Sequence, residues 1–342
     1  MNGKIDLSQA EGIADLIVAS SKASHDMAIN QTAGAFSKEI AKLRDSLTEF
    51  AALLELELDF TDEDVEFADR TKLTSLCDNI LRHIGKLTDS YARGAVLKDG
   101  VPVVIAGIPN AGKSSLLNLL ANDEKAIVTE IPGTTRDIIE DPIEIDGILY
   151  RFFDTAGLRE TDDLVEGIGV QKAKDALEKA YIIIWVIDSA SDIKPQIDLL
   201  ADYYKEHSEK NFILLLNKSD MNSDYASDLM KENFSPRFNT IIPFSTKTQS
   251  GLTPLLQTLN KLAVGNSHPE SDVIVANVRH FEALIKASEA LKRGRQGLVD
   301  GIPSDFVAQE IREVLHYLGT LTGTITTDNL LSSIFSRFCI GK

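Results

Sequence analysis

The chain has 342 residues, of which 43% are hydrophobic and 25% are charged, a composition typical of soluble globular proteins with two or three domains. Its formal net charge of −17 repels nucleic acid, so direct RNA binding would require a local basic patch or a basic partner. The sequence shows no signal peptide or apolar run of transmembrane length, and Cys77 and Cys339 alone exclude a disulfide framework or a cysteine zinc site, so we predict a cytoplasmic protein without membrane association.

The first part of the chain, residues 1–98, is predicted to be helical. Apolar residues recur every three or four positions in two sets, which places each set on one face of a helix. The sets are Phe36, Ile40, Leu43, Leu47, Phe50 and Leu54, and Leu73, Leu76, Ile80, Ile84, Leu87 and Tyr91. Between them, residues 59–69 are rich in acids. An EF-hand would need a glycine that is missing there, so we favour a solvated acidic turn over a calcium site.

The central part, residues 99–265, has the pattern of an α/β domain. Short β-branched runs alternate with helical stretches, and the runs occupy residues 101–105, 150–153, 181–187, 212–216 and 240–244. This alternation predicts a mostly parallel sheet with helices on both faces.

The last part, residues 272–342, returns to a helical pattern. One apolar stripe contains Phe281, Leu284, Ile285 and Leu291. Pro303 is expected to open a second helix that Gly319 can close, and a third helix is expected from Asp328 to about Phe338. Because each apolar stripe needs a partner, we predict that the first and last parts form one discontinuous helical domain around the central domain.

A phosphate-binding loop follows the first expected strand. Residues 107–114 read GIPNAGKS, a match to G-x-x-x-x-G-K-[ST]. The two glycines let the backbone curl so that its amide hydrogens point at phosphates. Lys113 supplies positive charge to the outer phosphates, the Ser114 hydroxyl ligates magnesium, and the following helix adds its positive end. The nucleotide-binding residues expected here are Asn110, Ala111, Gly112, Lys113, Ser114 and Ser115.

The string NKSD at residues 217–220 predicts which base is bound. Asp220 can accept two hydrogen bonds from the edge of guanine, whereas adenine lacks the matching donors. Asn217 and Lys218 are expected to brace the base and the P-loop. A second loop that contacts the base is expected at Ser245, Thr246 and Lys247, although the usual motif has alanine at the middle position. These motifs predict GTP as the substrate.

The string DTAG begins at Asp154, which can hold magnesium through water, while the Gly157 amide can sense the γ-phosphate. Thr134 and Thr135 lie where the first switch belongs. Either can complete the magnesium shell, and we favour Thr135. Leu158 occupies the place of the water-orienting glutamine found in many G proteins. Hydrolysis therefore needs another water-positioning group and another source of positive charge.

These motifs and their neighbours resemble the MnmE (TrmE) family of tRNA-modification GTPases. The similar strings are NGKIDLSQAEGIADLI from Asn2, GIPNAGKSSLLN from Gly107, AIVTEIPGTTRD from Ala126, DTAGLRE from Asp154, NKSD from Asn217 and IFSRFCIGK from Ile334. They are spread over nearly all of the chain, and the terminal CIGK is specific to this family. The resemblance implies an α/β P-loop GTPase domain inserted into an all-α helical domain, in a hydrolase that converts GTP to GDP and phosphate.

The resemblance also implies a potassium-stimulated reaction. In MnmE-like proteins the G domains dimerise around GTP and a potassium ion, which takes the place of an arginine finger. The implied potassium ligands are Asn110, Thr129, Ile131 and Thr134. Glu166 matches the glutamate that orients the attacking water, so the expected catalytic residues are Glu166 and Lys113.

Partners and one departure follow from the same resemblance. MnmE-like proteins act with MnmG, a flavin- and NADH-using partner, to modify the wobble uridine of certain tRNAs at carbon 5, and we expect tRNA to be contacted mainly through that complex. Family members carry an N-terminal folate-binding and dimerising domain, whereas this chain starts at Met1 in the NGKIDL string. We therefore predict a truncated chain without a folate site or a constitutive dimer. Cys339 is either a thiol of the uridine modification or a packing residue, and we favour packing.

Two other interpretations remain open. The first is an Era-type ribosome-assembly GTPase, because residues 294–297 read GRQG and match the G-x-x-G loop of an RNA-binding KH module. KH needs a helix after that loop, whereas Gly301 and Pro303 interrupt the sequence that follows, so a helix C-terminus is the favoured interpretation. The second is a G-domain switch that only binds partners, with hydrolysis as a slow timer.

Overall fold

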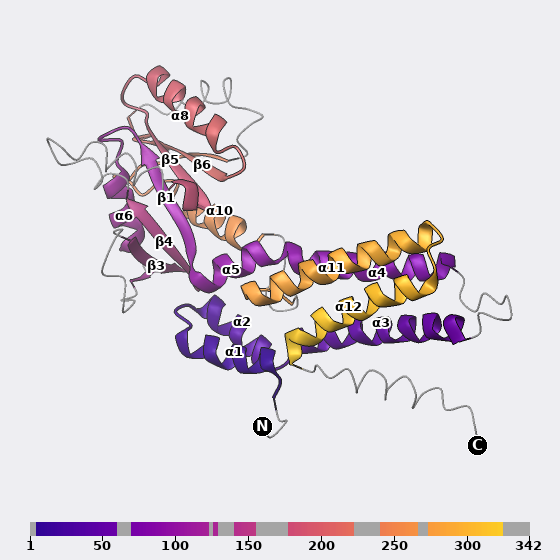
Figure 1. Ribbon diagram of the computed structural model, residues 1–342. Coiled ribbons are helices and arrows are strands. Elements are labelled where there is room, and N and C mark those ends of the chain that lie inside the picture. The colour runs from indigo at the N-terminus through magenta and orange to yellow at the C-terminus, as the bar shows by residue number, and fades with distance from the viewer. Residues whose placement is uncertain are drawn as a thin grey trace, which may run out of the picture. The chain divides into compact units, whose positions relative to one another are not determined.

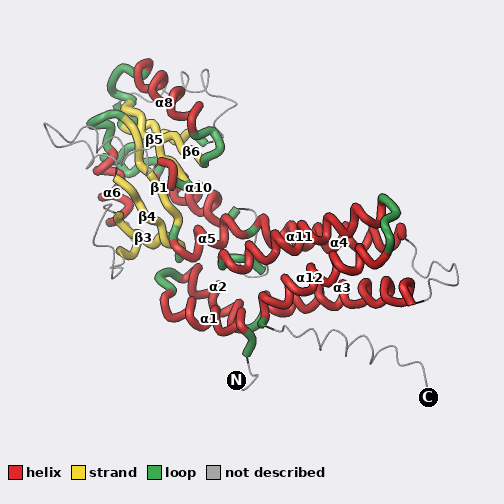
Figure 2. Tube along the Cα trace, viewed as in Figure 1, coloured by secondary structure: helices red, strands yellow, loops and turns green. Residues whose placement is uncertain are grey.

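The computed structural model describes residues 5–59, 70–122, 126–128, 140–154, 177–221, 240–265 and 273–323. The chain divides into two compact units (Figures 1 and 2). A helical unit comprises residues 1–19, 24–98 and 268–342, and an α/β unit comprises residues 20–23 and 99–267. Both ends of the chain therefore contribute to the helical unit. None of the described helices combines the length and apolar character needed to cross a membrane.

The helices before the α/β unit are α1 (Leu7–Val18), α2 (Lys22–Thr32), α3 (Ala35–Asp59), α4 (Arg70–Asp89) and α5 (Tyr91–Asp99), and those after it are α11 (Val278–Val299) and α12 (Ser304–Thr322). Helix α1 begins with a capping box. The Asp6 carboxylate accepts the Gln9 N–H at 2.8 Å, and the Gln9 side chain accepts the Asp6 N–H at 3.0 Å. Two N–H groups that the helix leaves unpaired are satisfied in this way.

The core of the helical unit joins α3 and α4 to α11 and α12. The predicted stripes supply it: Phe36, Ile40, Leu43, Leu47, Phe50, Leu54, Leu73, Ile80, Ile84, Leu87, Leu284 and Leu291 are all buried. The amphipathic-helix prediction is therefore confirmed for both flanks. In the second set, Leu76 and Tyr91 are partly buried and pack against this core. Tyr91 starts α5 instead of extending α4, and its ring stacks on Phe281 with centroids 4.2 Å apart.

Helices α11 and α12 approach closely where α11 carries glycine. A Cβ at Gly294 would lie 3.3 Å from the Cβ of Glu310, and one at Gly297 would lie 3.3 Å from a methyl carbon of Val307. The string GRQG thus lies in the last turns of α11, as the favoured interpretation predicted, and does not form the loop of a KH module.

The predicted end of α12 at Gly319 is wrong. The helix continues to Thr322 and ends at Gly323, whose φ of 73° is left-handed. Leu318 and Leu321 are both buried, so packing on either side of Gly319 outweighs the roughly 1 kcal/mol by which glycine disfavours a helix. The helix predicted from Asp328 lies outside the described residues, as does the acidic turn except for its first residue, Asp59, which ends α3.

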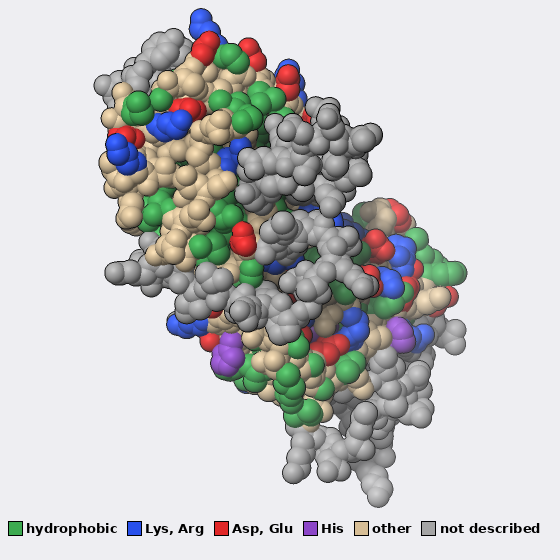
Figure 3. Space-filling model, turned by 90° about the vertical axis from the view of Figure 1, so that its left-hand side faces the viewer, with side chains coloured by type: hydrophobic (Ala, Val, Ile, Leu, Met, Phe, Trp, Pro, Cys, Tyr) green, Lys and Arg blue, Asp and Glu red, His purple; other side chains and the backbone are tan. Residues whose placement is uncertain are grey.

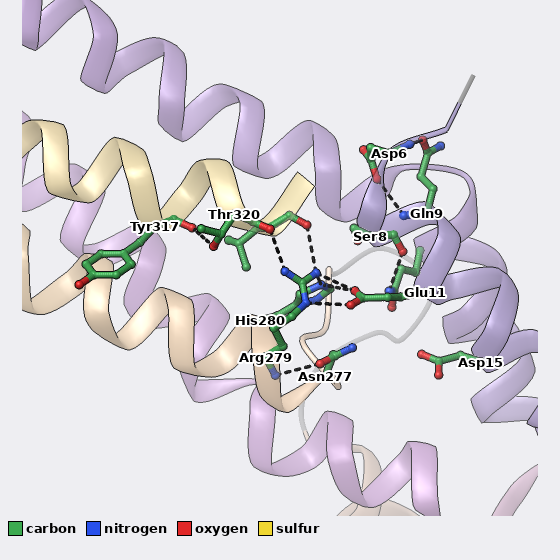
Figure 4. A network of polar contacts seen from close by, with 12 residues as sticks. Asp6, Ser8, Gln9, Glu11, Asp15, Asn277, Arg279, His280, Tyr317 and Thr320 are labelled. Carbon is green, nitrogen blue, oxygen red and sulfur yellow. Dashed lines mark hydrogen bonds and ion pairs between the residues drawn. The ribbon is translucent and has the colours of Figure 1, made fainter. Parts of the chain in front are cut away.

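A polar network connects α1 to α11 and α12 inside the helical unit (Figure 4). The Glu11 carboxylate accepts two hydrogen bonds of 2.8 Å from Arg279 and lies 2.8 Å from Nε2 of His280. Arg279 also donates to the Thr320 carbonyl at 2.8 Å. The His280 ring is buried and stacks on Phe36.

The α/β unit is built on a seven-stranded sheet in the order β2-β3-β4-β1-β5-β6-β7. The strands are β1 (Val101–Gly107), β2 (Ala126–Val128), β3 (Glu140–Ile145), β4 (Ile148–Asp154), β5 (Ile182–Asp188), β6 (Asn211–Asn217) and β7 (Ile241–Pro243). Strands β4, β1, β5, β6 and β7 run parallel, whereas β2 and β3 pair antiparallel at one end. The mostly parallel sheet is thus confirmed.

The helices described in this unit are α6 (Lys113–Ala121), α8 (Lys194–Glu206) and α10 (Leu252–Val264). Phe153 of β4 belongs to the cluster that Ile197 and Leu200 of α8 complete. Tyr150 points to the opposite face, since it lies three residues earlier on the same strand, and its hydroxyl donates to Asn260 of α10 at 2.8 Å. Helices therefore cover both faces of the sheet.

Candidate nucleotide-binding site

The motif-bearing strands end at one edge of the sheet. Strand β1 ends at Gly107, β4 at Asp154, β5 at Asp188 and β6 at Asn217. Because these strands run parallel, their carboxyl ends meet at the same edge, which is where α/β sheets bind ligands. The P-loop, the start of DTAG and NKSD are thereby brought to one edge, together with Asp188, which the sequence motifs did not single out.

The P-loop curls around the ammonium group of Lys113. That group donates to the carbonyls of Gly107 at 3.1 Å and Ile108 at 2.8 Å, and the Lys113 side chain is buried. Asn110 has a left-handed φ of 61°, and its side chain is exposed. Ser114 and Ser115 are exposed in the first turn of α6, beside the helix N–H groups that can bind an anion.

Both motif glycines are required by close contacts. A Cβ at Gly107 would lie 2.3 Å from the Val186 carbonyl oxygen of the neighbouring strand. A Cβ at Gly112, whose φ is 100°, would lie 2.1 Å from the side-chain nitrogen of Asn217. Real Cβ atoms do not come this close to other heavy atoms, so only glycine fits at either position.

Asn217 connects the P-loop to the loop after β7. Its side-chain nitrogen donates to the Ala111 carbonyl at 2.7 Å, and its side-chain oxygen accepts the Thr246 N–H at 3.2 Å. The side chain is 1% exposed, so both ends of a buried amide are satisfied. Thr246 contributes its backbone N–H to this contact, so threonine in place of the usual alanine leaves it intact.

The turn formed by NKSD is held by the loop after β7 and by the end of β5. The Ser245 hydroxyl donates to a carboxylate oxygen of Asp220 at 2.7 Å and accepts the Thr248 N–H at 3.2 Å. Lys218 has a left-handed φ of 61°, and its ammonium group lies 2.6 Å from the Asp188 carboxylate. Asp220 and Lys247 are exposed.

Asp188 is the site residue that sequence reasoning missed. The signal was an acid that ends a strand, IIIWVID, in which every residue is buried. The Asp188 side chain is 10% exposed, so its carboxylate has to be paired or hydrogen-bonded, and Lys218 is its ion-pair partner.

The P-loop offers oxygen ligands that suit hard cations. The Ser114 hydroxyl and the Asn110 amide are exposed oxygen ligands at the P-loop, and oxygen ligands are what Mg²⁺ prefers. Within the described ranges, no group of three or more His, Cys, Asp or Glu side chains could hold a metal by itself. The other predicted ligands and site residues, Thr129, Ile131, Thr134, Thr135, Gly157 and Glu166, lie outside the described residues, and only the backbone of Asp154 is described.

Of the two cysteines, Cys77 is buried in the helical core, and burial raises the pKa of its thiol to about 12. A thiol in this setting is unreactive at neutral pH, so Cys77 serves packing. Cys339 lies outside the described residues.

A P-loop after the first strand of a mostly parallel sheet, in contact with an N-K-x-D turn at the end of β6, two strands away, defines a P-loop GTPase domain. A sequence profile described as the MnmE helical domain matches residues 7–339. The chain is 46% identical over 346 residues to the tRNA modification GTPase MnmE of Bacteroides fragilis and 45% identical over 343 residues to that of Cytophaga hutchinsonii. These matches cover 100% of this chain and 74% and 73% of the two relatives. The chain belongs to the MnmE family of GTPases.

Solved structures of G domains are also similar to parts of the chain. The Era protein of Aquifex aeolicus bound to GDP and AlF4⁻ is 28% identical, with a TM-score of 0.39, over 55% of this chain and 65% of that one. The cytosolic domain of the FeoB iron transporter of Thermotoga maritima in a GDP form is 20% identical, with a TM-score of 0.37, over 65% and 97%.

Proposed function

We propose that this protein is a potassium-stimulated GTP hydrolase that takes part, with an MnmG-like flavoprotein, in modifying the wobble uridine of tRNA at carbon 5. The proposal is supported by relatives named tRNA modification GTPase that match the full length of the chain. The observation that carries the nucleotide site is the buried Asn217, which joins the Ala111 carbonyl of the P-loop to the Thr246 amide.

In this proposal the base and the phosphates are bound by separate loops. Asp220 accepts two hydrogen bonds from the guanine edge, Lys218 flanks the base, and the loop of Ser245, Thr246 and Lys247 contributes backbone N–H groups. At the other end, the amides of residues 110–115 and the Lys113 ammonium bind the phosphates, aided by the positive end of α6. Lys113 is already directed into the mouth of the P-loop by its bonds to the Gly107 and Ile108 carbonyls.

Hydrolysis then needs an oriented water and charge neutralisation. Mg²⁺ on Ser114 and Thr135, and K⁺ on Asn110, Thr129, Ile131 and Thr134, would supply the positive charge that stabilises the transferring phosphoryl group. Asp154 would hold the magnesium through water, and the Gly157 amide would contact the γ-phosphate. Glu166 accepts a hydrogen bond from the attacking water, which Leu158 cannot do.

The partners follow from charge and from the family. Lys and Arg side chains lie among Asp and Glu on the face shown in Figure 3. Arg293 pairs with Glu310 and Glu313, and Arg295 pairs with Asp78. Because the chain carries a net charge of −17 and both of these arginines are paired within it, tRNA is contacted mainly through the complex with the flavoprotein. GTP binding brings two G domains together as a homodimer, and the protein acts in the cytoplasm.

The proposal is tested by measuring steady-state GTP turnover in potassium and in sodium chloride at equal ionic strength and saturating GTP. We expect much faster hydrolysis in potassium, and we expect Asn110→Ala to remove most of that difference because it deletes one ligand. Equal rates in the two salts would contradict potassium stimulation. Slow turnover under all conditions, unaffected by the flavoprotein, would instead favour a switch that only binds partners.

A further inference from the structure

We infer that Asp188 is a positioning residue for guanine nucleotide binding, acting through Lys218. The inference rests on the proposed role of residues 217–220 in binding the base. It adds to the site a residue on β5, a strand that carries neither the P-loop motif nor the NKSD string. The contact on which it stands is the 2.6 Å ion pair between the Asp188 carboxylate and the Lys218 ammonium.

The sheet itself brings the two residues together. Strands β5 and β6 pair in parallel with Asp188 opposite Asn217, so Lys218 is the first residue beyond the paired end of β6. The backbone N–H of Ser189 also donates to the Asn217 carbonyl at 3.0 Å. The carboxylate is therefore held at a fixed place beside the turn that carries Asp220.

Asp188 is held from its other side by α8. The Gln196 side chain accepts the Asp188 N–H at 2.9 Å and donates to the Asp188 carbonyl at 3.1 Å. Ala190 donates its N–H to the carboxylate oxygen that Lys218 does not contact, at 2.9 Å. Gln196 is 2% exposed, so this clamp is built into the interior and does not depend on solvent.

The consequence falls on the Lys218 side chain. Because the Lys218 ammonium is anchored at the end of β5, the aliphatic stem of this side chain has to reach from the end of β6 to the end of β5 and cannot sample many rotamers. A long side chain loses conformational entropy when it is fixed. Asp188 fixes it before a nucleotide arrives, so a base that packs on the stem does not have to order it. Loss of Asp188 should therefore weaken binding of every purine nucleotide and leave base selectivity unchanged.

The test is a binding cycle with a fluorescent GDP analogue on the full chain, using Asp188→Asn, Lys218→Met and the double variant. Asparagine keeps the acceptor for the Ala190 N–H and removes the charge. We expect Asp188→Asn to weaken GDP binding by roughly 5- to 30-fold, with the same factor for inosine and xanthosine diphosphates. The double variant should bind like Lys218→Met alone, because Asp188 acts through Lys218. Asp198→Asn on α8 is the charge-matched control and should bind like the parent.

Additive losses in the double variant, or unchanged GDP binding by a folded Asp188→Asn protein, would overturn the inference. A purely structural role predicts a lower melting temperature with unaltered affinity of the folded fraction. If Asp188→Asn does not fold, Asp188→Glu replaces it, and parental affinity in that variant would also overturn the inference, since one extra methylene displaces the anchor. If the parent protein itself shows no preference for GDP over adenosine diphosphate, the assignment of residues 217–220 fails instead.

Discussion

Gly112 and Asn217 are separated by 105 positions in the sequence, yet a Cβ on Gly112 would lie 2.1 Å from the side-chain nitrogen of Asn217. The P-loop backbone rests directly on the side chain that begins the base-recognition motif. The two motifs therefore pack against each other, and a change in the P-loop backbone at Gly112 would displace the Asn217 side chain, which also donates to the Ala111 carbonyl.

That contact predicts the effect of Gly112→Ala. The added methyl group would displace Asn217 from the Ala111 carbonyl, and alanine would also be strained at a φ of 100°. We expect nucleotide affinity to fall by at least about tenfold, corresponding to about 1.4 kcal/mol. The comparison variant is Gly85→Ala in α4, where a Cβ would meet nothing within 4 Å, and which should raise helix stability and leave binding alone. Titration with a fluorescent nucleotide measures the affinity of both variants. Parental affinity of Gly112→Ala would contradict the packing argument.

Asp220→Asn should change which base is preferred. Asparagine keeps one side-chain oxygen, so it can still accept the Ser245 hydroxyl that holds the turn. Its amide now donates where the carboxylate accepted, which disfavours guanine and suits xanthine. We expect weaker GTP binding and a gain for xanthosine triphosphate, measured by parallel titrations. GTP affinity equal to that of the parent would show that Asp220 does not contact the base.

Glu166→Ala should slow the chemical step without affecting nucleotide binding. A positioned group that orients water contributes on the order of 10²-fold or more to the rate, and Leu158 offers no hydrogen bond to replace it. The rate is measured in a single turnover with excess protein at high concentration, so that weak association of G domains does not limit it. The affinity is measured separately with a fluorescent nucleotide. Hydrolysis at the parental rate would assign the water to another residue in the segment 159–170.

The network around Glu11 predicts acid sensitivity of the helical unit. Burial lowers the pKa of His280 from 6.5 to about 4, against the opposing effect of the Glu11 carboxylate. Burial acts to raise the pKa of Glu11, but hydrogen bonds and charges from Arg279 and His280 outweigh it, so that pKa is lowered as well. In the unfolded chain both groups take up protons at a higher pH than in the fold. The stability they support is therefore complete above about pH 6.5 and is lost as the pH falls toward 4.

His280→Gln tests whether His280 causes this loss of stability in acid. Glutamine can still donate to Glu11 but does not titrate, so the unfolding free energy of the variant protein should change less between pH 7 and pH 5. We expect the parent to lose about 1–2 kcal/mol more than the variant over this interval, as measured by urea unfolding. His25→Gln, at an exposed position in α2, should lose as much as the parent. An equal loss in His280→Gln and the parent would show that His280 is not the titrating group.

Several features of the fold follow from local sequence alone. The stripe from Phe36 to Leu54 specifies a helix with one buried face because its spacing matches the helical repeat. The runs that become β1 and β5 are apolar and rich in β-branched residues, and the run that becomes β6 is apolar and rich in leucine; such apolar runs are what a strand covered on both faces requires. Strand β3 reads EDPIEI, and its acids and Pro142 hide an element that only pairing with β4 reveals.

The motifs GIPNAGKS and NKSD were recognisable because phosphate and guanine binding each need a short string of fixed residue types on one loop. The sequence by itself thus determined the nucleotide, the class of protein and its family resemblance. Only the tertiary structure decided that Asp188 anchors Lys218 and that α12 passes Gly319, since both depend on what lies opposite in space. Asp188 was indistinguishable from any acid that follows a strand until β5 and β6 were paired in register. Contacts between distant segments carry no signature in either segment, because each side chain is selected for a partner that its own sequence does not contain.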